Sequence, residues 1–318
     1  MMVIAELIGK ALLGKITDKT LTKILGSLQS VSKKFGAKSD LQRITSELNN
    51  YFPGELEVLC FTRCAPHVDV IRDYPLNPDL KKRATAHRQR LKRQNRPNDL
   101  CATLAGEPNW HSEPILIEAE RISFSGLCAL REAGIRPEII SADALLICPD
   151  TEEVILHRRG ARKEGVEAYP GRLHIFGGAY ITPGGKDVDA DRGGLTSTVA
   201  REILEESQAA VAIDHLPPCM MTREVTPDFG YVSFSILGLP ISARTVGTLT
   251  GNWKGRIERI PFKSLGTVLQ RDDWVPQGKA LALAWLAVGA PNAKKGQRFG
   301  SRKAEELFGL LVNGKSSE

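Results

Sequence analysis

The sequence of 318 residues lacks the patterns that would assign it at once to a membrane, repeat or secreted class. It has no apolar run approaching the roughly 20 residues that span a bilayer as a helix. It also has no internal repeat or low-complexity tract. The first apolar stretch is interrupted by Glu6, Lys10 and Lys15, which argues against a secretory signal.

The cysteines lack the spacing of a disulfide framework. The six of them are at positions 60, 64, 101, 128, 148 and 219, mostly inside apolar runs. We therefore expect free thiols and a cytoplasmic protein in a reducing compartment. Cys60, Cys64 and His67 invite a zinc hypothesis, but no second ligand pair follows at a credible spacing. The sequence favours buried thiols at these positions.

Length and charge set the expected organisation. A chain of this size corresponds to about two domains. We predict a mostly helical N-terminal region with short strands at 1–136, an α/β unit at 137–290 and a basic tail at 291–318. The net charge of +6 favours acidic partners without identifying one.

Residues 1–36 carry apolar side chains at helical spacing. We predict a helix or helix pair that packs on its own domain or on a sister subunit, as in a homodimer. The alternative is a basic amphipathic helix lying on a membrane surface. Periodicity further predicts helices at 40–51, 127–132 and 279–288, and strands at 55–61, 139–148, 154–157, 173–176 and 230–237. Residues 97–114 read as a loop.

A basic run covers residues 81–96, KKRATAHRQRLKRQNR, with eight Lys or Arg and no acid. Such runs are usually solvated helix faces or linkers. The alternative is contact with phosphates, of nucleic acid or of a phosphorylated substrate. No aromatic residue interleaves the basic ones to stack on single-stranded bases. Nucleic acid is therefore an alternative partner that the sequence does not favour.

An unusual acid cluster lies in the stretch from residue 172 to 211, which has helical periodicity from Leu195 onward. Leu195, Val199 and Ile203 fall four apart, which predicts a helix with a buried stripe. The segment Arg201–Glu206 adds three carboxylates at i, i+3 and i+4 on another side, where like charges repel. A hard divalent cation reverses that repulsion, because Mg²⁺ is bound by carboxylate oxygens together with substrate phosphates. The alternative is an ordinary solvated helix face.

These residues resemble the signature of the Nudix hydrolases, G-x5-E-x7-R-E-U-x-E-E-x-G-U, in which U is aliphatic. Every specified position from Arg201 to Glu206 matches, whereas Gln208 replaces the last glycine. Two glycine pairs compete for the start of the motif. The pair at 177–178 follows a predicted strand and is preferred, since a strand, a Gly-Gly turn and a helix suit the motif. The pair at 184–185 would place Asp191 at the first glutamate.

The resemblance implies an α/β (α+β) fold with a mixed sheet between helices, and hydrolysis of a pyrophosphate bond in a nucleoside diphosphate linked to another moiety. It implies Mg²⁺ or Mn²⁺ as cofactor and a nucleotide-type small molecule as substrate. Glu205 and Glu206 would bind the metal, and Glu202 would join them or accept a proton from water. The Gly177 carbonyl would complete the shell, and Arg201 would hold Glu205 in place.

Other candidate residues come from outside the motif. Arg158 and Arg159 follow a predicted strand and would either neutralise substrate phosphates or belong to a solvated loop. Glu224 and Glu258 are candidates for a further acidic ligand. The altered ends of the motif leave a second reading open, a Nudix fold that has lost turnover and senses a nucleotide. A third reading makes the 81–96 run the working part of a nucleic-acid-associated protein.

Overall fold

One mixed sheet of eleven strands organises the part of the chain that the structure describes. This computed structural model describes residues 38–160, 169–182, 191–224, 230–252 and 254–288, so the predictions for 1–36 and for the 291–318 tail lie outside it. The strands are, in chain order, β1 (Leu56–Thr62), β2 (His67–Asp73), β3 (Leu100–Leu104), β4 (Leu116–Ser123), β5 (Glu138–Cys148), β6 (Glu153–Arg159), β7 (Leu173–His174), β8 (Phe176–Ala179), β9 (Cys219–Glu224), β10 (Gly230–Pro240) and β11 (Gly255–Pro261).

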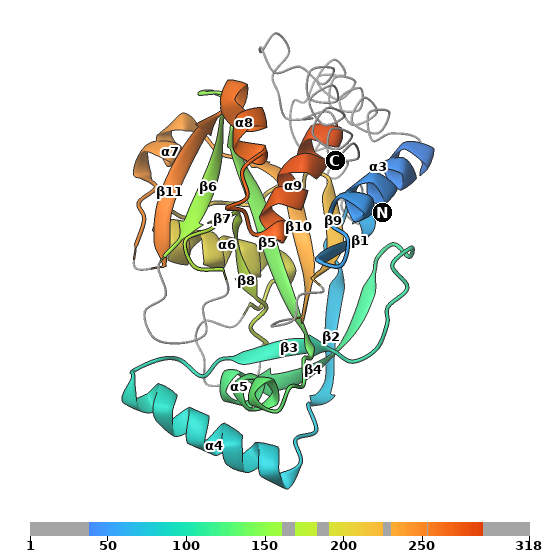
Figure 1. Cartoon of the computed structure of the whole chain (residues 1–318), viewed down its shortest axis with the longest axis vertical. Coiled ribbons are helices and arrows are strands. Elements are labelled where there is room, and N and C mark those ends of the chain that lie inside the picture. Colours follow the sequence, from blue (N-terminus) through green and yellow to red (C-terminus); the bar gives the residue numbers. More distant parts are fainter. Residues whose placement is uncertain (1–37, 161–168, 183–190, 225–229, 253, 289–318) are drawn as a thin grey trace, which may run out of the picture.

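Helices cover the sheet (Figure 1). They are α3 (Lys38–Tyr51), α4 (Pro78–Arg93), α5 (Phe124–Glu132), α6 (Leu195–Ser207), α7 (Ala243–Thr248), α8 (Leu265–Leu269) and α9 (Pro276–Ala287), with a 3₁₀ turn η1 at Phe262–Ser264. The predicted helices at 40–51 and 127–132, the one from 195 onward and the one at 279–288 are confirmed as α3, α5, α6 and α9. In the described ranges, no helix is long and apolar enough to cross a membrane.

The long strand β5 is the centre of the sheet. One edge pairs in parallel with β10. The other edge pairs antiparallel with β3, β8 and β6 in turn along its length. Nearly every residue of β5 is buried, which explains why its sequence is almost uninterruptedly apolar. The pairing with the middle of β5 fixes the position of β8 in the sheet.

Two apolar cores lie on the two faces of the sheet. Alternate residues of β5 point to opposite faces. Leu145 and Ile147 join the core that includes α3 and α9, whereas Ala144 and Leu146 join the core that includes α6. The sheet is therefore sandwiched between helices, and the predicted fold class is confirmed.

Strands from the N-terminal part belong to the same sheet. β1 pairs antiparallel with β9, and Thr103 of β3 pairs with Ile139 of β5. The sheet thus continues across the boundary predicted at 136/137. The prediction of a loop throughout 97–114 is wrong, because Leu100–Leu104 forms β3. This strand has five residues, and its partners β4 and β5 are distant in sequence, so local patterning gave little signal.

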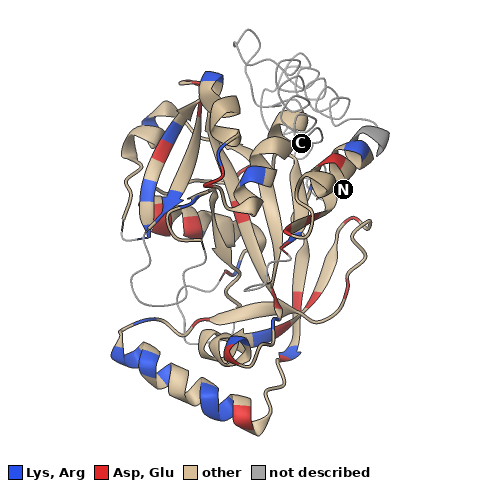
Figure 2. Cartoon of the chain, viewed as in Figure 1, with Lys and Arg blue, Asp and Glu red and all other residues tan. Residues whose placement is uncertain are grey.

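The basic run forms the helix α4, which confirms a helix rather than a linker. Asn77 caps its first turn by accepting a hydrogen bond from the Leu80 amide. Leu80, Ala84, His87 and Leu91 form the buried face. Figure 2 shows basic residues along most of this peripheral helix, and Lys81, Lys82, Arg88, Lys92 and Arg93 are exposed. All six cysteines are free, and Cys64 is the one among them that is not fully buried.

Candidate active site

The helix α6 is fixed to the sheet by its apolar stripe. Leu195, Val199 and Ile203 are at most 1% exposed and belong to the core that also contains residues of β5. The helix packs against β8 and β5. Glu202 and Glu206 are buried next to this stripe rather than opposite it, so the position of their carboxylates follows from the packing of the helix.

The three glutamates do not all point to one place. Glu202 and Glu206 are 7% and 4% exposed and lie against β8. The Glu206 Oε2 atom accepts a hydrogen bond from the Gly177 amide at 3.3 Å. Glu205 is turned outward, where its Oε2 atom lies 2.6 Å from the Nζ atom of Lys254. Among the described residues, no three Asp, Glu, His or Cys side chains form a ready metal-binding group.

The glycine pair of β8 gives the carboxylates room. The pair is in a strand and not in the predicted turn. A Cβ atom on Gly178 would lie 2.2 Å from Oε1 of Glu202, and one on Gly177 would lie 2.2 Å from the Cβ atom of Asp143. The two glycines are therefore needed for close approach on both sides of the strand, rather than for a special backbone angle.

Arg201 holds the acid face together. Its Nη1 atom donates to Glu202 at 2.8 Å and to Glu205 at 2.9 Å. Its Nε atom donates to Asp191 at 2.9 Å, and its Nη2 atom to the carbonyl of Ala179. Although burial opposes the charged form, the hydrogen bond to Asp191 and the charges of the acids raise the pKa of Arg201. The guanidinium therefore remains a permanent cation beside the glutamates.

Asp191 ties the loop before α6 to the helix. It is 2% exposed and accepts hydrogen bonds from the Ile181 amide and the Thr198 hydroxyl, as well as from Arg201. Because these hydrogen bonds fix the Asp191 carboxylate, Asp191 holds Arg201 in position. Each of the two alignments of the motif considered from the sequence contributes residues to the site. Gly177 and Gly178 of the first lie against Glu206 and Glu202, and Asp191 of the second pairs with Arg201. The pair at 184–185 lies outside the described residues.

Burial and like charge decide the protonation of the inner acids. Burial, followed by the negative charge of Glu202, raises the pKa of Glu206 to about 8. The nearest imidazole gives little help, because burial lowers the pKa of His157 to about 4 and leaves it neutral, with its Nδ1 atom 3.5 Å from Glu206. Glu202 has Arg201 and Lys254 as counter-charges, whereas Glu206 holds a proton in place of one. Two adjacent buried carboxylates fit a divalent cation, since Mg²⁺ needs only one or two carboxylates besides waters and phosphates. Glu202 and Glu206 would be these ligands.

The two arginines after β6 have different surroundings. Arg158 is bound by Glu258, by Asp273 at 2.9 Å and by the Gly171 carbonyl at 2.7 Å. Both Arg158 and Glu258 are therefore engaged in the frame of the protein. Arg159 instead lines a cavity of about 130 Å³ beside the glycine pair. No acidic side chain in the described part of the chain pairs with it.

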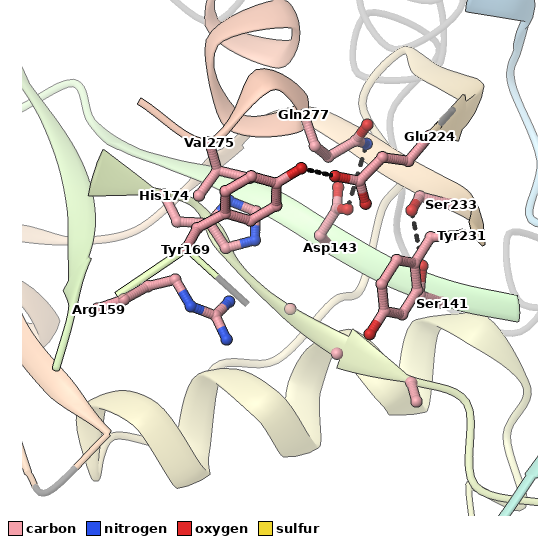
Figure 3. Close-up of a pocket in the computed structure, with 13 residues that line it drawn as sticks. Ser141, Asp143, Arg159, Tyr169, His174, Glu224, Tyr231, Ser233, Val275 and Gln277 are labelled. Atoms are coloured by element: carbon pink, nitrogen blue, oxygen red, sulfur yellow. Dashed lines mark hydrogen bonds between the residues drawn. The ribbon is translucent and has the colours of Figure 1, made fainter. Parts of the chain in front are cut away.

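This cavity contains Glu224, which the sequence offered as a candidate acidic ligand, together with Asp143 and Gln277, which it did not single out. Figure 3 shows its lining, with Asp143, Glu224 and Gln277 on one wall and Arg159 on the side nearer α6. The signals were present but weak: Asp143 is the acidic residue of an otherwise apolar stretch of β5, and Gln277 begins an apolar helix. Lys254 and Asp191 were likewise missed as partners of the acid cluster, because they contact it only in the folded chain.

Comparisons with known proteins find solved structures that resemble part of this chain. No family model matches the sequence, and no curated protein matches it. Among solved structures, a MutT protein from Methanosarcina mazei Go1 is 18% identical over 46% of this chain and 91% of its own, with a TM-score of 0.33. A MutT NUDIX hydrolase from Burkholderia pseudomallei is 14% identical, over 45% of this chain and 94% of its own, with a TM-score of 0.31.

A third solved structure is a bifunctional NMN adenylyltransferase/ADP ribose pyrophosphatase from Francisella tularensis, complexed with AMP and a Mn ion. It is 13% identical and aligns over 49% of this chain and 43% of its own, with a TM-score of 0.35. This chain therefore spans less than half of that protein. Each of the three structures is similar to about half of this chain, and at these scores the likeness assigns it no activity.

Proposed function

We propose that the chain hydrolyses a pyrophosphate bond in a nucleoside diphosphate linked to another moiety, with Mg²⁺ or Mn²⁺ held at the acid face of α6. One observation carries the proposal: Glu202 and Glu206 are buried side by side against Gly177 and Gly178. Glu202 has Arg201 and Lys254 beside it, but no Lys or Arg among the described residues forms an ion pair with Glu206. A buried carboxylate without such a partner is costly, and a bound cation would neutralise it. A role of Glu202 and Glu206 in metal binding would explain why the fold keeps this costly arrangement.

The residues around the acids have separate roles. A bound cation would offset charge on the pyrophosphate oxygens and make a water more acidic. Glu206 would supply an oxygen ligand to it. Glu202 would either join the ligand set or accept a proton from water, and Arg201 and Lys254 keep its carboxylate oriented. Glu205 would join the ligand set on leaving Lys254.

Substrate phosphates need a positive group that is not already paired. Arg159 meets this need, since it lines the cavity beside the glycine pair and has no ion-pair partner in the described ranges. Gly177 and Gly178 line the same cavity and contact the carboxylates of Glu206 and Glu202, so the cavity that Arg159 lines adjoins the acid face. Arg158 contributes indirectly by fixing the end of β6 through Glu258 and Asp273.

The test is Glu206→Gln, which keeps the shape of the side chain and removes its charge. Nucleotide sugars, dinucleotides and nucleoside triphosphates are screened with Mg²⁺, and turnover is read as phosphate released after a phosphatase step. We expect the variant to lose turnover by a factor of about 10² or more, with an unchanged circular dichroism spectrum. Glu118→Gln, on the exposed face of β4, is the matched control. Undiminished turnover in Glu206→Gln contradicts the site assignment.

A nucleotide sensor without turnover is the second candidate. The observation that favours it is Lys254, whose Nζ atom lies 2.6 Å from Glu205 and 3.4 Å from Glu202, in the space where a cation would compete. Tight ligand binding without product at millimolar Mg²⁺ supports the sensor. If Lys254→Gln then restores turnover, the ammonium group is what suppresses it.

A further inference from the structure

The helix α4 carries positive charge that the proposed hydrolysis does not use. Figure 2 shows basic residues along this helix at the edge of the molecule. Arg83 pairs with Asp79 at 2.9 Å, and Arg90 contacts the Nδ1 atom of His87 at 2.7 Å. The remaining basic residues of the helix are exposed and form no ion pair within the described ranges: Lys81, Lys82, Arg88, Lys92 and Arg93. These cations are therefore available to an anionic partner.

This face differs from an ordinary solvated helix face, the alternative that the sequence left open. Solvated surfaces mix charges of both signs. On the strands β2 and β4, for example, Arg72 pairs with Glu120 at 2.6 Å. On α4, in contrast, Arg88 and Lys92 are four residues apart, where like charges repel each other. A polyanion bound along the helix would replace that repulsion with attraction.

The outermost line of α4 consists of side chains that can read bases. At about 100° per residue, Lys82, Gln89 and Arg93 lie opposite the buried face of the helix, and all three are exposed. In the major groove of DNA, Arg and Lys hydrogen-bond to guanine and Gln to adenine. That groove is about 12 Å wide and admits an α-helix, whose diameter with side chains is about 10–12 Å. The outer line of α4 is therefore suited to face base edges.

Cations also lie on both sides of that outer line. Lys81, Arg88 and Lys92 fall within about 40° of one another on one side. Arg83 and Arg90 lie on the other side, next to Asp79 and His87. A helix in the major groove has a phosphate backbone on each side, and contacts to phosphates fix its orientation on the duplex. The distribution of charge around α4 matches this arrangement.

We propose that the outer face of α4 binds the major groove of double-stranded DNA. The helix carries no Phe, Tyr or Trp on which the bases of a single strand would stack. The major groove of duplex RNA is deep and narrow, so side chains do not enter it. A membrane surface is disfavoured because the apolar side of α4 is buried in the protein and does not insert into lipid. Figure 1 shows α4 away from α6, so this surface is separate from the acid face.

The test is binding of the full chain to a fluorescein-labelled DNA duplex of two helical turns, measured by fluorescence anisotropy over a series of NaCl concentrations. We expect the DNA duplex to bind about tenfold or more tightly than an RNA duplex or a DNA single strand of the same sequence. A DNA duplex whose pyrimidines carry a bulky C5 substituent, which projects into the major groove, should bind about tenfold more weakly. Equal affinities for the DNA and RNA duplexes, or no effect of the C5 substituent, overturn the proposal.

A triple variant tests the phosphate contacts. In Lys81→Gln/Arg88→Gln/Lys92→Gln, the slope of log affinity against log salt concentration should fall by about 3, since each lost phosphate contact removes about 0.9. Vesicles of phosphatidylcholine and phosphatidylserine provide the comparison with a membrane. If the variant loses vesicle binding and keeps its affinity for the DNA duplex, α4 faces a membrane and the proposal is overturned.

A second triple variant controls for net charge. Arg43→Gln/Arg244→Gln/Lys263→Gln removes the same charge from exposed positions on α3, α7 and η1, at the other end of the molecule (Figure 1). We expect its salt slope and its affinity for the DNA duplex to stay close to those of the parent. An equal fall in both variants means that net charge alone attracts DNA, which overturns the assignment to α4.

Discussion

Gly178 and Glu202 occupy space that a single additional carbon would remove. A Cβ atom on Gly178 would lie 2.2 Å from Oε1 and 2.4 Å from Cδ of Glu202. The contact joins β8 to α6 across the acid face. Gly178 therefore contributes to the site because the absence of a side chain leaves room for the Glu202 carboxylate.

The first prediction concerns this contact. Gly178→Ala pushes on the end of a flexible side chain and not on backbone, so we expect the free energy of unfolding to change by about 1 kcal/mol. Pyrophosphate hydrolysis should fall by a factor of about 10² because Glu202 is displaced. Steady-state kinetics and urea unfolding measure the two effects. Gly106→Ala, where a Cβ atom meets no other atom, is the control and should change neither.

The second prediction concerns the anchor of Arg201. Asp191→Ala removes a buried partner of the guanidinium and leaves the Ile181 amide without its acceptor. We expect the free energy of unfolding to fall by about 3 kcal/mol. The exposed pair of Asp79 with Arg83 gives the comparison, since Asp79→Ala should cost no more than about 0.5 kcal/mol. Similar urea midpoints for the two variants would show that Asp191 is not an anchor.

The third prediction concerns the altered end of the motif. Gln208 ends α6 with φ of 59°, a left-handed conformation that favours glycine. Its amide still closes the helix on the Leu204 carbonyl at 2.8 Å. We expect Gln208→Gly to raise the free energy of unfolding by about 0.5–1 kcal/mol. A lower thermal midpoint in this variant would mean that the Gln208 contact with Thr250 matters more than the backbone angle.

The fourth prediction is a pH dependence. Burial raises the pKa of Asp143 to about 7, above its ordinary value of 3.8. In the unfolded chain the proton leaves near the ordinary value, so this group contributes stability below pH 4 and loses it as the pH rises through 7. Asp143→Asn should therefore gain stability relative to the parent between pH 4 and 8, by at most roughly 4 kcal/mol. Denaturant unfolding at both pH values measures it. A constant difference contradicts the raised pKa.

The fifth prediction concerns α4, which Figure 1 shows at the edge of the molecule, away from α6. Five exposed basic residues of this helix can be neutralised together: Lys81, Lys82, Arg88, Lys92 and Arg93. We expect pyrophosphate hydrolysis to remain within about twofold of the parent, because surface charges at this distance are largely screened. If nucleic acid is a partner, the same variant lowers the salt slope of its binding. An unchanged slope removes that alternative.

The sequence by itself determined the elements with strong local patterns. The stripe of Leu195, Val199 and Ile203 predicts a helix, and a helix brings Glu202, Glu205 and Glu206 together within one turn. The apolar run 139–148 requires a buried strand. The mixed sheet between helices was implied by the resemblance of residues 201–206 to the Nudix signature, and such an arrangement lets each element bury one face.

Only the tertiary structure decided what surrounds the acids. The glycine pair allows close packing and does not form a turn, because β5 and α6 contact β8 from two sides. The sequence of β8 alone does not indicate which elements will pack against it. Lys254 and Asp191 contact the residues of the acid face only because folding brings distant segments of the chain together. The cavity unites Asp143, Glu224 and Gln277 from three elements. Contacts between residues distant in sequence depend on how layers pack, and local periodicity specifies the layers without specifying their contacts.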